Sequence, residues 1–525
     1  MKRVELYDTT LRDGSQNDGI SFSVEDKIRI TQRLDEIGIR YIEGGWPGSN
    51  PKDKAYFEKI KEIPLKNAMV TAFGSTRRPN IPVEQDDNLR ALLESQTTTV
   101  TIFGKIWDLH VTEIMANTLK ENLCMIEDSV RYLKDQGRTV FYDAEHFFDG
   151  YRANPEYAVK TLQAAANGGA DTLVLCDTNG GTLPYDITTA TQKMMKLFPN
   201  HTFGIHTHND MGLAVANTLN AVLAGATMVQ GTMNGYGERC GNADLITVIP
   251  ILQVKMDTEV IPPENLHKLR PLSLFVSEVA NTPPAANHPF VGKNAFTHKG
   301  GIHVSAIQKN PMAYEHISPE IVGNHRRVLV SDLAGKSNIQ CKIQELGLTI
   351  DPTSIDAKDI VRQIKQLEEY GYQFDSADGS FRIFVEKASQ QFRPLFELES
   401  FRVAIEKNEN RPCASRANVK LRVGDATEMT AAEGDGPVSA LDNALRKALA
   451  KFYPNLDEMH LVDFKVRVID GLVGTVAKVR VMIESGDSEE TWTTIGVSDD
   501  IIEASWQALA DSFQYKLSKD QKKTS

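Results

Sequence analysis

The amino-acid sequence predicts an α/β protein: a (β/α)8 TIM barrel, then a mostly helical linker region, then a C-terminal α+β domain. In the first half, eight short apolar runs alternate with longer amphipathic helical patterns. A (β/α)8 barrel needs eight such units in roughly 250 residues. Beyond residue 395, strand patterns alternate with two long helical patterns, which is typical of a separate α+β domain. The expected boundaries are 1–270 for the barrel, 271–394 for the linker region, 395–518 for the C-terminal domain and 519–525 for a flexible tail.

The predicted barrel strands are short, apolar and mostly followed by polar residues. They are residues 6–8, 41–44, 70–73, 100–103, 140–143, 173–177, 203–206 and 228–231. The clearest helices between them are 24–37, 115–136 and 155–167, and the last is followed by Gly168 and Gly169, a common helix end. An open doubly wound sheet is the alternative. The eight repeats and the absence of a G-x-G-x-x-G motif make it the second choice.

The alternation of strand and helix patterns ends after residue 262. Several prolines precede a glycine- and histidine-rich segment at 298–303, which predicts a linker with an ordered functional loop. Two helices are then expected, at 339–346 and 357–370. The C-terminal domain is predicted to have strands at 400–405, 417–423, 461–468 and 477–483, and helices at 436–452 and 500–514. Its lysine-containing end, 516–523, is expected to be frayed and solvated.

Composition limits the classes of function. The 525 residues are 41% hydrophobic and 24% charged, with a formal net charge of −12. This charge argues against a nucleic-acid or anionic-membrane surface. The five cysteines are scattered without a C-x-x-C pair, which makes a disulfide framework or a thiolate zinc site improbable and predicts a reducing cytoplasm. No signal-peptide pattern and no bilayer-length apolar run is found, so we expect a cytoplasmic protein without a membrane partner.

Polar side chains follow the ends of most of the predicted barrel strands. They are Asp8, Arg12, Asp13, Glu43, Arg77, Arg78, Glu145, His146, Asp177, Thr178, His206, His208, Asn234 and Asn242. In a barrel of this kind the active site is built from the loops that follow the strands. We therefore expect these side chains to converge on one mouth of the barrel.

A metal site is predicted at His206 and His208. Alternate residues of a strand point to the same side, so both imidazoles can reach one cation. Asp13 and an amide oxygen of Asn242 would complete the set. Imidazole suits zinc, iron or manganese, and carboxylate and carbonyl oxygens suit magnesium or manganese. The alternative is a pair of hydrogen-bonded structural histidines. The stretch Asn209-Asp210-Met211-Gly212 that follows, and the expected position opposite Asp13, favour the metal interpretation.

Other polar residues near the predicted mouth allow two interpretations each. Arg12 either forms a surface ion pair with Asp13 or stabilises the negative charge that develops on a carbonyl oxygen, and its place after the first strand favours the second role. Glu145 either caps a helix or serves the site. The glycine-rich residues 231–242 could cradle a phosphate, but they contain no P-loop lysine. For Cys240, we expect a small buried thiol rather than a nucleophile.

Three stretches, 8–16, 206–214 and 237–243, resemble the family of metal-dependent acyl-transferring and carbon–carbon-cleaving barrels. That family includes 2-isopropylmalate synthase, homocitrate synthase, citramalate synthase and hydroxymethylglutaryl-CoA lyase. Residues 43–53 and 103–110 resemble its pyruvate-using branch. Residues 434–441 and 492–498 resemble the regulatory domain of the synthases, which binds an end-product amino acid at a dimer interface. The lyases lack this domain, so the resemblance implies biosynthetic condensation.

The resemblance implies a reaction and a role for each candidate residue. Acetyl-CoA is enolised and attacks pyruvate, and the thioester is hydrolysed to give citramalate and CoA. The sister reactions of 2-isopropylmalate synthase and homocitrate synthase, and a sensor protein without catalysis, are the alternatives. The implied metal is divalent, magnesium or manganese, with zinc as the alternative. The implied metal ligands are Asp13, His206, His208 and Asn242; the catalytic residues are Arg12, Glu145, His303 and Tyr314; the substrate-binding residues are Arg12, Gln16 and Thr178.

The linker histidine shows one departure from the family pattern. His303 matches a catalytic residue that is often supplied by the partner subunit, but Ser305 stands where many members of the family carry an acidic residue. Another group must then orient this histidine. The resemblance also implies a homodimer or a higher homo-oligomer, and inhibition by isoleucine, with leucine as the alternative.

Overall fold

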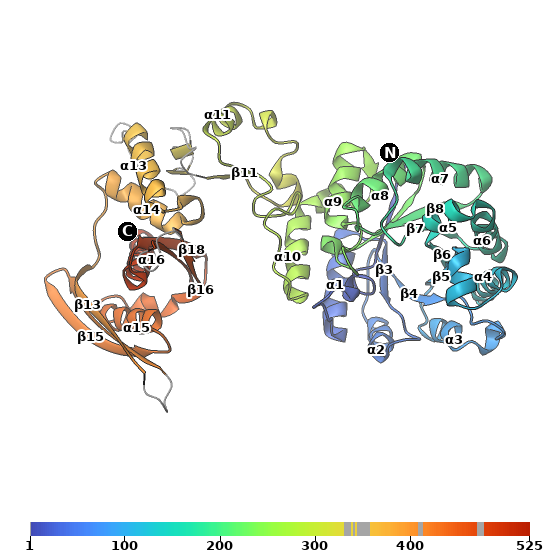
Figure 1. The fold of residues 1–525 in the computed structure, drawn as a ribbon, viewed down its shortest axis with the longest axis horizontal. Coiled ribbons are helices and arrows are strands. Elements are labelled where there is room, and N and C mark those ends of the chain that lie inside the picture. Colours follow the sequence, from blue (N-terminus) through green and yellow to red (C-terminus); the bar gives the residue numbers. More distant parts are fainter. Residues whose placement is uncertain are drawn as a thin grey trace. The chain divides into compact units, whose positions relative to one another are not determined.

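The computed structural model describes residues 2–329, 338–339, 342–343, 357–407, 413–469 and 477–524. The chain forms two compact units, whose elements can be followed by colour in Figure 1. The first unit comprises Met1–Phe296 and Ile317–His325, and the second comprises Thr297–His316 and Arg326–Ser525. None of the helices in the described residues combines the length and the apolar character that crossing a membrane requires.

The first unit contains a closed barrel of eight parallel strands, as predicted. Each strand pairs with the next one in sequence, and the last pairs with the first. The strands are β2 (Glu5–Asp8), β3 (Tyr41–Gly45), β4 (Met69–Ser75), β5 (Thr99–Lys105), β6 (Thr139–Glu145), β7 (Thr172–Asp177), β8 (Thr202–Thr207) and β9 (Met228–Gly231). All eight predicted strands are therefore confirmed.

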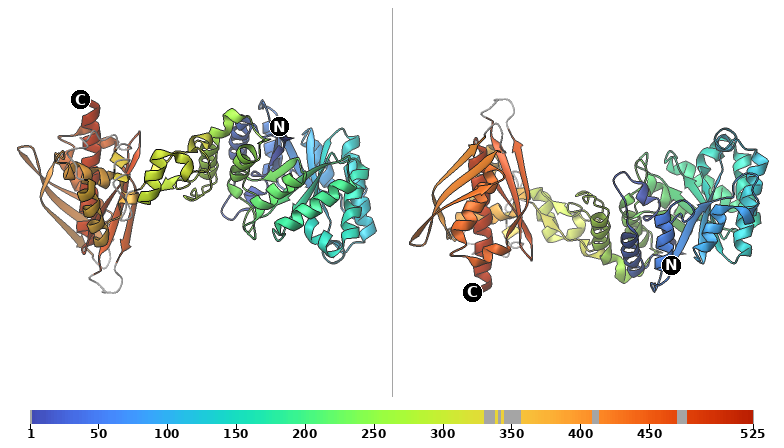
Figure 2. Two further views of the ribbon diagram at one scale, coloured as in Figure 1. Left: turned by 90° about the horizontal axis from the view of Figure 1, so that it is seen from above. Right: turned by 90° about the horizontal axis from the view of Figure 1, so that it is seen from below.

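Helices surround the barrel strands (Figures 1 and 2). They are α1 (Val24–Ile37), α2 (Pro51–Ile60), α3 (Asp87–Glu94), α4 (Leu119–Asp135), α5 (Phe147–Ala153), α6 (Pro155–Gly168), α7 (Pro184–Leu197), α8 (Ala214–Ala224), α9 (Leu245–Pro250) and α10 (Leu269–Val279). Helix α1 has the predicted bounds because Ser23 and Asp26 form a capping box and Gly38 ends the helix in a left-handed conformation. The helix predicted from residue 115 begins at Leu119 instead, because the Thr118 side chain caps it.

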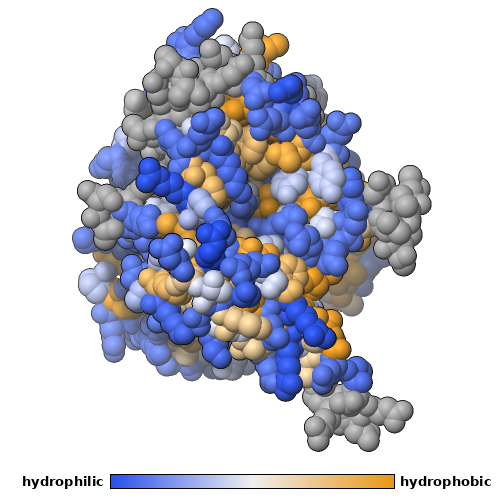
Figure 3. All heavy atoms as spheres, turned by 90° about the vertical axis from the view of Figure 1, so that its left-hand side faces the viewer, coloured by the Kyte–Doolittle hydropathy of each residue, from blue (hydrophilic) through white to orange (hydrophobic). Residues whose placement is uncertain are grey.

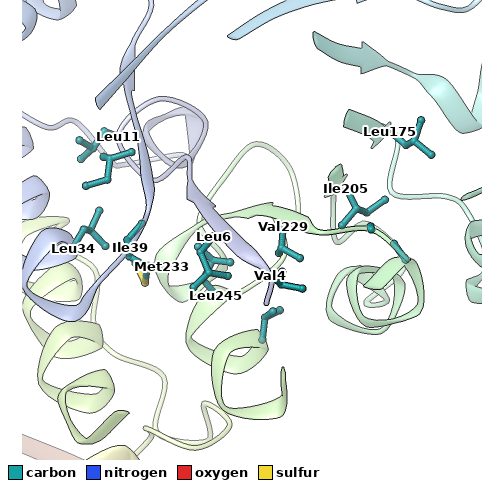
Figure 4. Packing of buried hydrophobic residues seen from close by; sticks show 14 of the residues in the cluster. Val4, Leu6, Leu11, Leu34, Ile39, Leu175, Ile205, Val229, Met233 and Leu245 are labelled. Atoms are coloured by element: carbon teal, nitrogen blue, oxygen red, sulfur yellow. The ribbon is translucent and has the colours of Figure 1, made fainter. Parts of the chain in front are cut away.

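The barrel core has apolar residues on both sides of the strands. Outside, Leu6 of β2 packs with Val229 of β9 and with Leu245 of α9, and all three are fully buried (Figure 4). Inside, the rings of Tyr7, Tyr41 and Phe141 meet, at centroid distances between 5.0 and 6.2 Å. The alternation of strand residues between these two layers fixes which side chains face the barrel axis.

The second unit begins with short elements and a small helical core. It contains β11 (Thr297–His298), α11 (Gly301–Lys309), β12 (Arg327–Val328), α13 (Ala357–Tyr370) and α14 (Asp378–Ala388). Helix α13 has the predicted bounds. Most of the helix predicted at 339–346 lies outside the described residues. Ile360 and Ile364 of α13 pack against Phe381 and Val385 of α14 in a cluster of their own.

The C-terminal part repeats one pattern, three antiparallel strands followed by a helix. The elements are β13 (Glu397–Glu406), β14 (Ala414–Val423), β15 (Ala426–Gly434), α15 (Pro437–Leu449), β16 (His460–Val468), β17 (Val479–Gly486), β18 (Thr491–Ser498) and α16 (Ile501–Thr524). Each helix packs on its own sheet, and the two helices contact each other (Figure 2). Strands β15 and β18 were not predicted. The Ala, Glu and Thr residues of β15 give only a weak apolar alternation.

The end of the chain differs from the prediction. Helix α16 continues to Thr524, where the sequence analysis expected a frayed end and a flexible tail at 519–525. The Nζ atoms of Lys516 and Lys519 each lie 2.9 Å from Asp487 Oδ2, and both lysine side chains are at most 10% exposed. Residues 519–524, predicted as part of a tail, thus belong to helix α16, and their flexibility stays a prediction. Ion pairing to the loop after β17 holds these lysines, which the sequence analysis took as a solvated charge run.

Candidate active site

Three side chains of types that can ligate a metal meet at the mouth of the barrel. Asp13 Oδ2 lies 3.3 Å from His206 Nε2 and 3.8 Å from His208 Nε2, and the two Nε2 atoms are 3.1 Å apart. All three side chains are buried. Among the described residues, they form the one group of acidic, histidine and cysteine side chains with the spacing of metal ligands. The loop after β2 and the end of β8 thus bring together residues almost two hundred positions apart.

Asn242 lies next to this cluster. It forms an antiparallel bridge with His208, and its Nδ2 donates to the carbonyl of Tyr236 at 3.1 Å. Its Oδ1 is buried without a hydrogen-bond partner, and so is Oδ1 of Asp13. An unsatisfied buried polar atom costs about 1–3 kcal/mol. Two orphaned oxygens beside two imidazole nitrogens are a donor set that fits a divalent cation.

The protonation states of the cluster suit a cation. Burial opposes ionisation of Asp13, but Arg12 and the two histidines hold the pKa of this carboxyl well below its usual range. Burial and the neighbouring His206 lower the pKa of His208 to about 3. Asp13 is therefore a carboxylate at neutral pH, and His208 is a neutral imidazole. These are the forms that ligate metals.

Arg12 is fixed beside the cluster by a buried carboxylate. Its Nε donates to Glu43 Oε1 at 2.5 Å, and its Nη1 lies 3.3 Å from Asp13 Oδ2. Its guanidinium stacks on Phe73, 3.8 Å from the ring centroid. Glu43 is fully buried and accepts a second hydrogen bond from the Tyr7 hydroxyl at 2.6 Å. The alternative of a surface ion pair for Arg12 is therefore wrong, because the side chain faces the barrel mouth.

A cavity of about 220 Å³ opens beside these residues. Trp46, Phe73 and Phe103 form an aromatic wall: the Phe rings stack 5.5 Å apart, and Trp46 meets both edge-on at 5.7 Å. The cavity is lined by Arg12, Asp13, Gln16, Trp46, Phe73, Phe103, Asp143, Glu145, Cys176, Thr178, His206, His208 and Glu238. The aromatic wall was not predicted from the sequence. It could have been predicted from Phe73 and Phe103, because both lie in the second halves of their strands, β4 and β5, near the ends that form the mouth.

The structure brings the candidate residues Gln16, Glu145 and Thr178 to the same cavity. Glu145 ends β6 and forms an ion pair with Lys105, which ends β5. Helix α5 has His146 at its N-cap position, so Glu145 is not the N-cap residue of this helix. The Thr178 hydroxyl accepts from the His146 backbone N–H at 2.9 Å. Because His146 and not Glu145 is the N-cap residue of α5, the interpretation of Glu145 as a helix cap is wrong.

Several other polar residues named from the sequence do not line this cavity. Arg77 is engaged by Glu121 and Asp128, with Nη–O distances of 2.8 and 2.9 Å. Asn234 bonds to Ser273 and Ser277. Each of these two residues thus makes hydrogen bonds or ion pairs elsewhere in the first unit.

The loop of residues 231–242 uses several of its backbone N–H groups for hydrogen bonds within the loop. The backbone N–H groups of Gly235, Gly241 and Asn242 donate to carbonyls within the loop. A Cβ at Gly241 would lie 1.9 Å from the carbonyl oxygen of Gly235, so only glycine allows the close approach that presents Asn242. Cys240 is exposed, so the expectation of a buried thiol was wrong.

His303 and Tyr314 lie in the second unit. Their rings stack at a centroid distance of 4.1 Å and an angle of 28°. The next residue, Glu315, accepts from Arg326 Nε and Nη2, both at 2.6 Å, and lies 3.2 Å from His298. Position 305 is a serine in this chain, and the side chain that contacts the His303 ring is Tyr314.

A cluster of two histidines and an aspartate with the spacing of metal ligands, at the carboxyl ends of barrel strands, is typical of enzymes of the (β/α)8 class. The matches of this chain to models of known protein families agree with this class. A model described as HMGL-like matches residues 3–276, one described as homocitrate synthase post-HMGL domain-like matches 290–371, and one described as LeuA allosteric (dimerisation) domain matches 376–517. The chain belongs to the HMGL-like family, and within it to the group of (R)-citramalate synthases.

Relatives that match over their full length support the assignment to the (R)-citramalate synthases. The chain is 54% identical to (R)-citramalate synthase of Aquifex aeolicus over 521 residues, and 54% identical to (R)-citramalate synthase of Geobacter sulfurreducens over 522 residues. In both cases 99% of each chain is covered. By comparison, it is 36% identical to 2-isopropylmalate synthase of Sulfolobus acidocaldarius, over 72% of this chain and 94% of that one.

Proposed function

We propose that this enzyme condenses acetyl-CoA with pyruvate and hydrolyses the resulting thioester to (R)-citramalate and CoA. The observation that carries the proposal is the likeness to five proteins named (R)-citramalate synthase, 45–54% identical over nearly the whole chain. The small cavity beside Arg12 supports a small 2-oxo acid as the acceptor. The sister reaction of 2-isopropylmalate synthase is the alternative, given the 36% identical relative.

Asp13, His206, His208 and Asn242 are proposed to hold a divalent cation, magnesium or manganese, with zinc as the alternative. The two unpartnered oxygens and the two ring nitrogens support this set. A bound divalent cation supplies Lewis acidity toward a carbonyl oxygen. Arg12 is proposed to stabilise the negative charge on the former keto oxygen of pyruvate. Its bond to Glu43 keeps the guanidinium in place before the charge develops.

The remaining candidates are proposed to bind substrate and move protons. Gln16 and Thr178 line the cavity and can donate to the carboxylate of a 2-oxo acid. Glu145 is proposed to support acetyl-CoA chemistry. His303, with Tyr314 against its ring, is proposed as the base that takes a proton from the acetyl methyl group, whose carbon then bonds to C2 of pyruvate. Water finally cleaves the thioester and releases the CoA thiol.

The C-terminal domain is proposed to form a homodimer and to bind isoleucine, with leucine as the alternative effector. Its match to an allosteric dimerisation domain supports both roles. The sheets also expose apolar residues on their outer strands: Ile405, Met429, Leu461, Val462, Val466 and Val468. In Figure 3, apolar side chains lie among hydrophilic ones on the face shown. We also propose a cytoplasmic location, from the scattered cysteines.

The substrate is tested by measuring thiol release from acetyl-CoA with pyruvate, 2-oxobutyrate, 2-oxoisovalerate and 2-oxoglutarate. We expect the highest kcat/KM with pyruvate. A preference for 2-oxoisovalerate would favour the 2-isopropylmalate reaction, and no thiol release with any of them would contradict the synthase function. The same assay with added isoleucine or leucine tests the effector, and isoleucine is expected to inhibit more strongly.

A further inference from the structure

A buried hydrogen-bonded chain leads from the metal cluster into the barrel. His206 Nδ1 lies 2.8 Å from Gln230 Oε1, and Gln230 Nε2 donates to Asp143 Oδ1 at 3.0 Å. All three side chains are buried, and Gln230 is fully so. They come from three barrel strands, β8, β9 and β6, and His206 and Gln230 are direct partners in the ladder between β8 and β9. Backbone pairing thus fixes which two side chains meet.

The donors and acceptors of this chain have one consistent direction. An amide offers N–H groups at one end and a carbonyl oxygen at the other, and a carboxylate only accepts. With the amide nitrogen toward Asp143, the amide oxygen faces His206 and can only accept. The hydrogen of a neutral His206 ring must then be on Nδ1, and the lone pair on Nε2 faces Asp13 and His208.

Metal binding needs this tautomer of His206. Its Nε2 lies 3.3 Å from Asp13 Oδ2 and 3.1 Å from His208 Nε2, inside the proposed ligand group. A hydrogen on Nδ1 leaves the lone pair of Nε2 free for a cation.

We propose that Gln230, held by Asp143, is a positioning residue that presets the tautomer and the orientation of His206 for metal binding. The inference rests on the metal site proposed above. Metal-ligating histidines generally donate their other ring N–H to such a partner, and losing that partner typically weakens metal affinity by about 10–100-fold. Neither Gln230 nor Asp143 is one of the proposed ligands. Their effect would pass through His206.

The test is Mn²⁺ binding to the full-length protein, measured by titration calorimetry. Gln230→Leu is expected to weaken Mn²⁺ affinity by roughly 10–100-fold. Asn324→Leu is the matched control, because Asn324 is a buried amide that bonds to two carbonyls elsewhere in the first unit. This control is expected to bind Mn²⁺ like the wild type. Wild-type affinity in Gln230→Leu would overturn the proposal.

Exchanging the amide of Gln230 and the carboxylate of Asp143 separates the effect of their hydrogen bonds on His206 from an effect on the packing of the barrel. Gln230→Glu places a carboxylate against Asp143 and is expected to weaken Mn²⁺ binding. Adding Asp143→Asn returns an amide donor to the chain, so the double variant is expected to recover affinity. These isosteric variants keep the test valid if Gln230→Leu does not fold. A double variant no better than Gln230→Glu would contradict the inference. A wild type that binds no Mn²⁺ would instead refute the metal site itself, and the inference with it.

Discussion

Arg12 and Glu43 form a buried ion pair at the mouth of the barrel, with 2.5 Å between Nε and Oε1. Glu43 has no exposed surface, and Tyr7 donates to its second oxygen. The guanidinium is therefore held in one orientation over the cavity before substrate arrives. Such preorganised charge is usually the largest electrostatic contribution to a reaction that builds up negative oxygen.

Glu43→Gln should lower kcat/KM for thiol release by roughly 10- to 100-fold, the equivalent of losing one hydrogen bond to a charged group. The amide keeps the shape of the side chain but loses its charge. Tyr7→Phe removes the second bond to Glu43, together with the bonds of this hydroxyl to Thr71 and Thr101, and leaves the ion pair intact, so it should have a smaller effect. Equal activities of Glu43→Gln and the wild type would show that the pair does not orient Arg12 for the reaction.

Asp13→Asn and His208→Ala should lose metal binding and thiol release together. Asp13→Asn removes the only carboxylate charge of the three-residue cluster, and His208→Ala removes one of its two imidazoles. The measurement is Mn²⁺ binding by calorimetry beside the thiol-release assay, with a chelator-treated wild type for comparison. Full acetyl-CoA turnover in either variant would contradict the proposed metal site.

Phe103→Ala should widen the cavity and shift selectivity from pyruvate to 2-oxobutyrate. One added methylene in an apolar pocket is worth about 1–3 kcal/mol, or roughly 10- to 200-fold in relative kcat/KM. Phe198→Leu is the control, because this buried ring follows α7 and does not line the cavity. An unchanged ratio of the two substrates in Phe103→Ala would exclude the aromatic wall from substrate selection.

His303→Ala should lower kcat without changing Mn²⁺ affinity, because a base in the second unit contributes nothing to the metal cluster. Tyr314→Phe retains the ring that stacks 4.1 Å from His303, so it should lose less activity than Tyr314→Ala. The comparison is made on kcat in the thiol-release assay. Equal losses in both Tyr314 variants would indicate that the hydroxyl, rather than the stacked ring, is what matters.

Asp487→Asn should destabilise the C-terminal domain by about 1–3 kcal/mol near neutral pH. Burial would raise the pKa of Asp487, but hydrogen bonds from Lys519, Lys516 and backbone N–H groups hold it well below its usual range. A lowered folded-state pKa gives stability that is present above the unfolded pKa, near 4, and is lost as pH falls below it. In thermal unfolding, the difference between wild type and variant should shrink below about pH 4. A constant difference would show that the charge is not responsible.

The barrel was predictable because its signals are local. Strands such as β7 are continuous apolar runs, and many of the polar residues that follow strands, among them Arg12, Asp13 and His206, come together at one end of the barrel. Glu43 was noted only as a strand end, because its pairing with Arg12 depends on three-dimensional register. The hydrogen-bonded chain through Gln230 was missed for the same reason. The helical end near Lys519 was missed because Asp487, its partner, lies 32 residues earlier in the sequence.

The first strand of the barrel, β2, pairs with the last, β9. Asp13 follows β2, whereas His206 and His208 lie at the end of β8 and Asn242 follows β9. The proposed ligand set therefore cannot assemble until the two ends of the barrel sequence have joined, the contact of longest sequence separation in the ring. Metal affinity then becomes a measure of ring closure during folding. Added cation should stabilise the closed barrel over any partly folded form in which β2 and β9 are still apart.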